Sequence, residues 1–276
     1  MELIKPVFDS HGAELTILET TGPGNARDLV NHLDLAVYDG IIALGGDGTF
    51  HEVVNGLLKR SDGAMLPLGL IPGGSGNSLL HDLALVEPMA AVSAICRGEK
   101  RFIDAAEINM NDRVVYSINL IGWGLVTDVG SRSELLRWLG PSRYTVSSII
   151  EIFRKKNRRA KLVIDDQTLV GEFSFVVACN SIHIGNGMKM APHAQIDDGL
   201  IDLLVVDSDI TRKRLFSVLP KLFDGTHVYE PEVKYHQVSR FSIISEEKDL
   251  LNVDGEMLGS TPINVKMLKQ AIEIFA

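Results

Sequence analysis

Two glycine-rich turns constrain the fold of this chain more than any other feature of its sequence. GGDGT (45–49) and PGGSGN (72–77) each follow a short apolar run and precede a segment with helical spacing. Strand, turn and helix in this order are typical of a parallel sheet with helices on its faces. The strands predicted around the turns span 13–20, 39–46 and 66–74, and the helices span 25–33, 50–60 and 78–97.

The pattern changes after Gly98. Short apolar runs separated by turn residues follow one another to the end of the chain, with helical patterns near 133–156 and 211–224. Closely spaced short strands of this kind predict an antiparallel sandwich. We therefore expect an α/β domain over 1–98 and a β-sandwich domain over 99–276.

Charge and composition exclude several classes of protein. The net charge of −9 disfavours a nucleic-acid partner, because an acidic surface repels a polyphosphate chain. No apolar run approaches the roughly 18 residues of a membrane span, and the N-terminus lacks a signal-like segment. We expect a cytoplasmic protein whose two cysteines are free thiols. Contact with a membrane surface would need a local basic patch. RKKNRRAK (154–161) is the candidate for it, although a solvated helix end is the favoured explanation of this run.

The glycine turns suit the binding of phosphate. Gly45, Gly46 and Gly48 have no Cβ, so the backbone can approach an anion at the start of the following helix. Asp47 would repel a phosphate unless it binds Mg²⁺ or accepts a proton from an attacking hydroxyl. An ordinary capped turn is the alternative for the first turn alone. In a parallel sheet, however, both turns meet at one edge, where ligands bind in open α/β folds.

The two turns together resemble a known family. GGDGTFHEVVNGL followed by IPGGSGNSLLHDL is similar to the catalytic domain shared by diacylglycerol, sphingosine and ceramide kinases, and its SGN form is nearer the sphingosine and ceramide branch. The segment 118–149 and LNVDGEMLG (251–259) resemble the family's lipid-site segment and its late DGE motif. The resemblance implies an ATP- and Mg²⁺-dependent lipid kinase, with a Rossmann-like nucleotide domain and a lipid-binding sandwich. Its acceptor would be the hydroxyl of a sphingolipid or of a diacylglycerol-like lipid at a membrane surface.

The resemblance also implies roles for individual residues. Asp47 would act as, or position, the general base, and Asp254 would lie at the metal. The nucleotide would be bound by Thr20, Gly45, Gly46, Gly48, Thr49, Gly74, Ser75, Gly76, Asn77, Arg137, Arg143 and Glu256. The lipid would be bound by Trp123, Leu125, Val126 and Asp128.

Most of these residues also have an ordinary structural explanation. Asp254 could be the first residue of an Asp-Gly hairpin turn, and Glu256 an ordinary charge on a strand. The apolar residues of the lipid-site segment could be sandwich core. Arg137 and Arg143 could be solvated helix positions. Glu52, in the helix after the first turn, could be a structural partner rather than a catalyst.

The chain departs from the family in two places. Family members open with a strand that ends in an Asn-Pro-x-x-Gly turn at the nucleotide, and no such turn precedes MELIKPVFDS. Either the chain is a fragment or an incomplete gene product, or the protein does without this first strand. Loss of the strand would leave an exposed sheet edge and a weakened ATP site. Sphingosine kinases also carry an aspartate where this chain has Gly130, so a protonated amine has no partner there. A ceramide-like or other neutral acceptor is favoured for this reason.

Three functions remain open on this evidence. The first is a lipid kinase, acting on a ceramide, a sphingoid base or a diacylglycerol. The second is a catalytically impaired lipid-binding protein or fragment, suggested by the missing strand. The third is a kinase of a soluble substrate such as NAD, suggested by the first turn alone and disfavoured by the second turn and the DGE motif.

Overall fold

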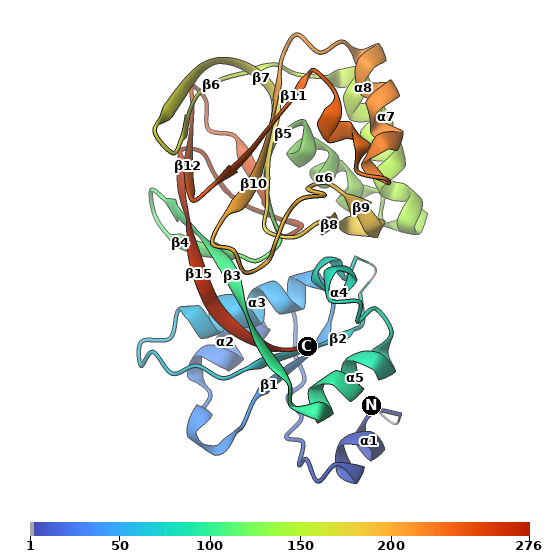
Figure 1. Ribbon diagram of the computed structural model, residues 1–276, viewed down its shortest axis with the longest axis vertical. Helices are drawn as coiled ribbons and strands as arrows, with labels where there is room; N and C mark the ends of the chain where they lie inside the picture. The colour runs from blue at the N-terminus through green and yellow to red at the C-terminus, as the bar shows by residue number, and fades with distance from the viewer. Residues whose placement is uncertain (1–2, 75) are drawn as a thin grey trace.

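A computed structural model describes residues 3–74 and 76–276, apart from the side chains of Arg137, Pro141 and Asn186. It has two parts, which lie one above the other in Figure 1. The N-terminal part contains α1 (Lys5–Ser10), α2 (Asn25–His32), η1 (Leu35–Val37), β1 (Ile41–Gly45), α3 (Asp47–Leu58), β2 (Leu68–Pro72), α4 (Ser78–Asp82) and α5 (Pro88–Arg97). β1 and β2 are parallel neighbours, as the alternation of strands and helices predicts. Leu68 and Leu70 of β2 share one buried apolar cluster with Phe50 and Val54 of α3.

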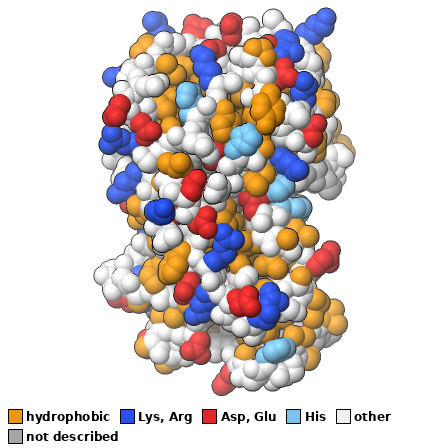
Figure 2. Space-filling view, in the orientation of Figure 1, with side chains coloured by type: hydrophobic (Ala, Val, Ile, Leu, Met, Phe, Trp, Pro, Cys, Tyr) orange, Lys and Arg blue, Asp and Glu red, His pale blue; other side chains and the backbone are white. Residues whose placement is uncertain are grey.

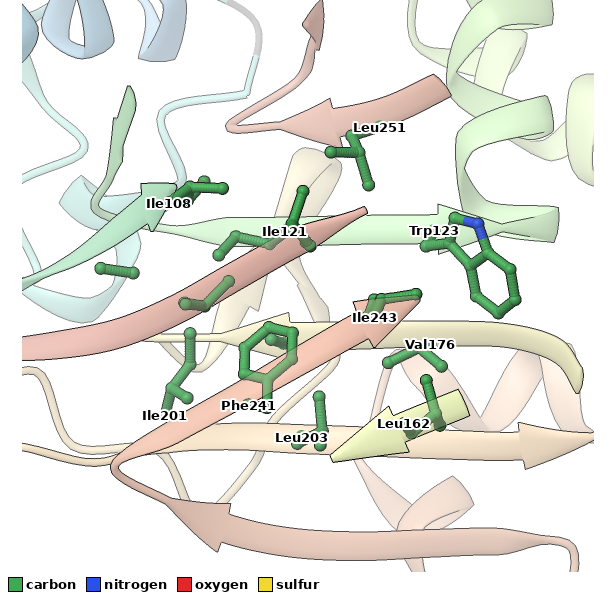
Figure 3. Packing of buried hydrophobic residues seen from close by; sticks show 14 of the residues in the cluster. Ile108, Ile121, Trp123, Leu162, Val176, Ile201, Leu203, Phe241, Ile243 and Leu251 are labelled. Carbon is green, nitrogen blue, oxygen red and sulfur yellow. The ribbon is translucent and has the colours of Figure 1, made fainter. Parts of the chain in front are cut away.

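The C-terminal part is the predicted antiparallel sandwich, with helices on one side (Figure 1). Its strands are β3 (Lys100–Met110), β4 (Val114–Ser117), β5 (Leu120–Gly124), β6 (Arg158–Ile164), β7 (Gln167–Cys179), β8 (His183–Ile184), β9 (Met188–Lys189), β10 (Ile201–Asp207), β11 (Val233–Val238), β12 (Arg240–Ser245), β13 (Leu250–Val253), β14 (Glu256–Ser260) and β15 (Ile263–Phe275). Its helices are α6 (Leu125–Leu135), η2 (Arg137–Ser142), α7 (Arg143–Arg154), η3 (Gly185–Gly187), α8 (Arg212–Val218), η4 (Leu219–Leu222) and η5 (Thr226–Tyr229). Side chains from facing strands interdigitate in the sandwich core (Figure 3).

One long strand pair joins the two parts. β3 and β15 are antiparallel over most of their length, and the far end of β15 reaches β2, where Ile274 lies opposite Leu68. Ile103 and Ile272, near this end of the pair, belong to the apolar cluster of the N-terminal part. The chain therefore leaves the N-terminal part along one strand and returns to it along the last one. The division at residue 98 remains a prediction.

The predicted strand over 13–20 is wrong. This segment forms no strand, and β1 is the last strand on its side of the sheet, with β2 as its neighbour. A slot of about 530 Å³ lies along β1 and is lined on its other side by residues 15–20. A segment with strand-forming side chains still needs a hydrogen-bonding neighbour, and here the slot separates it from the sheet edge. Among the described strands, β1 is thus an open edge of the sheet, as the sequence predicts.

The long helices predicted from sequence are interrupted. The segment 78–97 divides into α4 and α5, because Ala84 has a left-handed φ of 55° and Pro88 starts a new helix. The segment 133–156 divides where Gly140, with φ 57°, bends the chain between α6 and α7. Among the described residues, no helix is long and apolar enough to cross a membrane.

Candidate active site

The two glycine turns are in direct backbone contact. Gly73 N donates a hydrogen bond of 2.8 Å to Gly45 O, where β1 and β2 end side by side. A Cβ added at Gly74 would lie 2.5 Å from the Cα of Gly46, so no side chain fits between the turns. Glycine is required here by this close approach. The structure therefore brings the two predicted phosphate-binding turns together, as the parallel sheet requires.

Asp47 lies at the junction of the turns, as the first residue of α3. Its Oδ1 accepts a hydrogen bond from Ser78 N at 2.7 Å, and its Oδ2 accepts one from Ser78 Oγ at 3.2 Å. Burial raises the pKa of this carboxyl above its ordinary value, although the Ser78 bonds act in the opposite direction. The nearby Asp254 carboxylate raises the pKa further. A carboxylate of this kind can accept a proton from an attacking hydroxyl more readily than an ordinary aspartate.

The first turn of α3 offers backbone donors to an anion. Its N-cap is Gly46, which has no side chain to cap the free N–H groups. Gly48 lies in this first turn, and a Cβ there would be 2.9 Å from Oε1 of Glu256. The Glu256 carboxylate therefore covers Gly48, which joins the DGE motif to the first glycine turn. The helix N-terminus and its free amides suit a phosphate.

The second turn carries an unsatisfied acceptor. Asn77 has a left-handed φ of 50° and its Nδ2 donates to Gly74 O at 3.0 Å. Its Oδ1 is buried and has no hydrogen-bond partner among the described residues. A buried polar atom without a partner costs free energy, so this oxygen fits a ligand or a hydrated cation that donates to it or binds it. Gly76 lies against Asp47, since a Cβ there would be 2.4 Å from Oδ2, and Ser75 lies outside the described residues.

Asp254 and Gly255 form the tight turn between β13 and β14. Both have positive φ, 51° and 94°, as an Asp-Gly pair in a two-residue hairpin requires. The turn inserts the Asp254 side chain between the two parts of the molecule. Asp254 is 4% exposed and its Oδ2 accepts from His51 Nδ1 of α3 at 2.8 Å.

The Asp254 carboxylate is fully engaged by protein donors. Its Oδ1 accepts from Ser117 Oγ (2.6 Å) and from the N–H groups of Asn119 and Leu120, and its Oδ2 also accepts from Ile118 N. Burial raises the pKa of this carboxyl, but the bond and the charge of His51, followed by the bond from Ser117, outweigh burial and hold the pKa below its ordinary value. Such a carboxylate has little free capacity for a metal, so this geometry favours a structural role over the predicted metal ligand.

A magnesium ion fits the remaining groups only together with substrate phosphates. Within the described part of the chain, no three His, Cys, Asp or Glu side chains form a metal-binding group. Mg²⁺ commonly uses one or two carboxylates and completes its shell with water and phosphate oxygens. Glu256, which is exposed beside Gly48, and Asp47 are the carboxylates that could serve in this way. The unpartnered Oδ1 of Asn77 adds a neutral oxygen of the type Mg²⁺ accepts.

Thr20 and Thr49 line the slot along β1. Thr20 belongs to the irregular segment before α2, and Thr49 lies in the first turn of α3. The Thr49 side chain also packs on Gly45, where a Cβ would lie 2.5 Å from its Oγ1. The structure thus places these two predicted nucleotide residues on one cavity. All the residues that line this cavity belong to the N-terminal part, so the cavity does not lie between the two parts of the molecule.

The lipid-site residues divide between core and surface. Trp123 is fully buried in the sandwich core (Figure 3) and its ring packs edge-on against Phe173, so the core explanation accounts for it. Leu125 is buried under α7 and α8, where it also belongs to an apolar core. Val126 is half-buried against a separate apolar cluster. Asp128 binds Arg158 Nη2 with both oxygens, at 2.8 and 3.0 Å, and burial raises its pKa while Arg158 opposes that rise.

The predicted arginines are not joined to the glycine turns by any described contact. Arg143 begins α7, donates to Tyr144 OH at 3.0 Å and lies over the Tyr144 ring. The side chain of Arg137 lies outside the described residues. Their contact with nucleotide phosphates therefore stays a prediction.

Sequence reasoning gave no role to several residues that build this site. Ser78 holds Asp47, and its position at the start of the helix after the second turn is a signal that could have found it. His51 and Ser117, which are distant from Asp254 in the sequence, donate hydrogen bonds to its carboxylate. No local sequence pattern predicts either pairing. Glu52, for which the sequence had suggested a structural role, accepts hydrogen bonds from Gly24 N (2.6 Å) and Ala26 N (3.0 Å), and so holds the start of α2.

Two family profiles match the chain without overlap. Residues 1–108 match the diacylglycerol kinase catalytic domain, and residues 119–276 match the YegS C-terminal NAD kinase beta sandwich-like domain. The two matches together cover both parts of the structure. The first match ends in β3, one of the two strands that join these parts, and the second begins just before β5.

Curated relatives and solved structures are similar over nearly the whole chain. Sphingosine kinase 1 of Arabidopsis thaliana is 32% identical over 93% of the chain and 64% of its own length, so the chain spans slightly less than two thirds of that relative. A diacylglycerol kinase of Staphylococcus epidermidis is 32% identical over 97% of the chain and 84% of its own length. The crystal structure of a putative diacylglycerol kinase from Bacillus anthracis superposes with a TM-score of 0.82, covering 98% of this chain and 88% of the other at 24% identity. That last likeness shows the fold alone.

Proposed function

This chain belongs to the diacylglycerol kinase family, and from that premise we propose that it transfers a phosphoryl group from ATP to the hydroxyl of a membrane lipid. One observation carries the proposal most directly. The two glycine turns touch and hold Asp47 between them, beside the uncapped N-terminus of α3 and the Glu256 carboxylate. Phosphoryl transfer needs a positioned nucleophile and groups that neutralise phosphate charge, and this constellation supplies both.

Each group has a defined task in the proposed reaction. The free N–H groups of α3 and the backbone of the second turn bind the phosphates of ATP. The lipid hydroxyl oxygen attacks the terminal phosphorus while the bond from this phosphorus to the bridging oxygen breaks, so that ADP leaves. Asp47 accepts the proton of the lipid hydroxyl, and its raised pKa suits this transfer. Magnesium, when bound at Glu256 and Asn77 Oδ1, would neutralise charge on the phosphates. Asp254 holds His51 and the 117–120 segment, and so keeps the sandwich aligned with α3.

The acceptor that we favour is a neutral lipid such as a ceramide or a diacylglycerol. Gly130 lies in α6, and a Cβ at this position would be 2.7 Å from Asn252 Nδ2 and 2.8 Å from Met257 Cε. The space for a side chain is thus already filled by an amide and a thioether. A carboxylate partner for a protonated amine has no room there without movement of its neighbours. This argues against a free sphingoid base, although relatives of this chain carry the name sphingosine kinase.

A second function is favoured by the slot along β1. The slot runs along the free edge of β1 and reaches Thr20 and Thr49, on the side where the nucleotide is expected. If this open side leaves ATP weakly bound, the chain would bind lipid without turnover. The two functions differ in ATP consumption and agree in lipid binding.

The deciding assay uses labelled ATP, Mg²⁺ and mixed micelles that carry ceramide, diacylglycerol or sphingosine in separate reactions. We expect label in ceramide or diacylglycerol, and a fall of about 10²- to 10⁴-fold in Asp47→Asn. The matched control is Asp166→Asn, because Asp166 is an exposed aspartate whose side chain is 93% accessible. Label in sphingosine alone would contradict the interpretation of Gly130. Absence of label with every lipid, from a folded chain, would favour the lipid-binding function.

A further inference from the structure

Four large apolar side chains project into solvent from one helical layer of the sandwich. Leu135 is 77% exposed at the end of α6, and Trp138 is 79% exposed in η2. Ile149 and Phe153, on α7, are 40% and 65% exposed. We call these four residues the α6–α7 patch. A neighbouring group of exposed apolar side chains is more informative than single ones, because such groups mark interaction surfaces.

The helices that carry the patch are neighbours, because α7 packs against α6, η2 and α8. Arg132 Nε of α6 donates to Glu151 Oε1 of α7, which fixes how these two helices pack. Leu135 lies one turn beyond Arg132, and Ile149 and Phe153 lie four residues apart on one face of α7. The Phe153 ring also packs against Phe216 of α8, with ring centres 5.1 Å apart.

The patch is not an exposed edge of the core. The inner sides of these helices bury a separate cluster, in which Leu125 and Ile152 contact Leu215 of α8. α7 therefore has an apolar face toward the sandwich and a second apolar strip toward solvent. A helix that needs one apolar face for its own fold has no structural use for the second. The exposed strip of Ile149 and Phe153 is therefore a candidate surface for an external partner.

Basic side chains border the Phe153 end of the patch. Arg212 Nε donates to Phe153 O at 3.0 Å, which places the start of α8 beside the end of α7. Exposed cations at this point are Arg154, Lys156, Arg212 and Lys213, which we call the basic rim. Figure 2 shows Lys and Arg side chains among hydrophobic and some acidic ones at the end of the molecule that carries α7 and α8. Arg154 also lies 4.0 Å from Glu151, so its charge is partly balanced.

Ion pairs neutralise part of the basic run at 154–161. Arg158 binds Asp128 and Asp249, and it is largely buried in β6. Arg159 pairs with Glu246 at 3.5 Å. Two members of the 154–161 run, Arg154 and Lys156, remain in the basic rim, and α8 supplies the other two. The cationic surface is thus made by α7 and α8 together.

We propose that the α6–α7 patch and the basic rim dock this protein on an anionic lipid surface. A tryptophan with aliphatic and aromatic neighbours suits the boundary between headgroups and acyl chains. Arginine and lysine beside it attract anionic headgroups, which a chain of net charge −9 would otherwise meet with repulsion. This proposal rests on the proposed function, since a lipid acceptor requires a membrane, but its test does not depend on ATP turnover.

The chain contains its own reporter of docking. Trp123 is fully buried and Trp138 is exposed, and the sequence has two tryptophans. Vesicles of phosphatidylcholine, with and without phosphatidylserine, would be titrated while tryptophan emission and co-sedimentation are measured without ATP. We expect a blue shift of emission and sedimentation with the phosphatidylserine vesicles, and loss of the shift in Trp138→Ala.

Further variants test the two parts of the surface separately. Phe153→Asp should weaken binding to the anionic vesicles by about tenfold or more, and Lys156→Glu combined with Arg212→Glu should do so by a similar factor. The matched control is Val170→Asp, since Val170 is 68% exposed on β7 and should tolerate the change with binding unaltered. Circular dichroism would verify that each variant is folded.

Three results of the vesicle experiments would overturn the proposal. These are no binding to either vesicle, equal binding with and without phosphatidylserine, and unchanged binding in Phe153→Asp. A concentration-dependent dimer that Phe153→Asp abolishes, in the absence of lipid, would also overturn it, because a second copy would then cover the patch. Failure of the kinase assay with intact vesicle binding would reject the proposed catalysis and leave the docking surface in place.

Discussion

Two aspartates that each precede a glycine, Asp47 and Asp254, differ in the hydrogen bonds they accept and in the direction in which their pKa is shifted. Asp47, in the N-terminal part, accepts hydrogen bonds from one residue, Ser78, and its pKa lies above the ordinary value. Asp254, in the sandwich, accepts five hydrogen bonds and its pKa lies below the ordinary value. The donors around a carboxylate, and not its residue type, decide whether it is free to exchange a proton. The first is thus suited to chemistry and the second to holding the two parts together.

Of the changes that distinguish the two aspartates, Asp254→Ala is expected to have the largest effect on stability. Removal of this carboxylate leaves His51, Ser117 and three backbone N–H groups without their acceptor in a buried place. We expect the free energy of unfolding to fall by about 3–5 kcal/mol, as for other broken buried pairs. Urea unfolding followed by circular dichroism measures it. If Asp254→Ala lowered the free energy of unfolding by less than Asp47→Ala does, the assignment of structural and chemical roles would be reversed.

Substitution at the close approach of Gly74 to Gly46, beside Asp47, should have the next largest effect on stability. Gly74→Ala would place a Cβ 2.5 Å from the Cα of Gly46, and backbone cannot move aside as a side chain does. We expect a loss of about 1–3 kcal/mol in the free energy of unfolding, together with weaker nucleotide binding. Gly171→Ala is the matched control, because its Cβ would meet only ordinary contact at 3.8 Å. Equal effects of the two substitutions would mean that the turns do not need their close approach.

A smaller effect is expected from Ser78→Ala. This variant keeps the backbone N–H bond to Asp47 Oδ1 and removes the hydroxyl bond to Oδ2, at a cost of about 1 kcal/mol. Because that bond lowers the pKa of Asp47, its loss should raise the pKa further. The acid limb of kcat/KM should therefore move to higher pH, which a pH–rate profile would detect. A profile identical to that of the wild type would show that Asp47 does not govern the limb.

The smallest difference should appear in the pH dependence of stability. The raised pKa of Asp47 favours its neutral form in the folded state, so its contribution is present below pH about 3.8 and is lost as pH rises through the folded pKa. The lowered pKa of Asp254 has the opposite sign, and its contribution is present above pH about 3.8 and is lost as pH falls through the folded pKa. Unfolding of Asp47→Asn and Asp254→Asn from about pH 3 to 7 should show opposite slopes relative to the wild type. Parallel slopes would contradict one of the two shifts.

Local patterns predicted the parts of the fold that depend on neighbours in sequence. The strand, glycine turn and helix around 45–49 were predicted with boundaries within a few residues, and the Asp-Gly pair predicted the turn at 254. The strand over 13–20 was wrong, because a strand needs a neighbour and the sequence cannot show that the place beside β1 is a slot. Trp123 and Leu125 fell in apolar cores, since an apolar run has the same pattern whether it lines a pocket or fills a sandwich.

The sequence by itself determined the family, the two glycine turns and Asp47 between them, because backbone turns and close approaches require particular residues at adjacent positions. Only the tertiary structure decided what surrounds each charged group. It paired Asp254 with His51 and Ser117 across more than a hundred residues, buried Arg158 in ion pairs, and left the α6–α7 patch in solvent. The physical reason is that burial and hydrogen bonding depend on distances in space, and these distances are set by how β3 and β15 bring the two parts together.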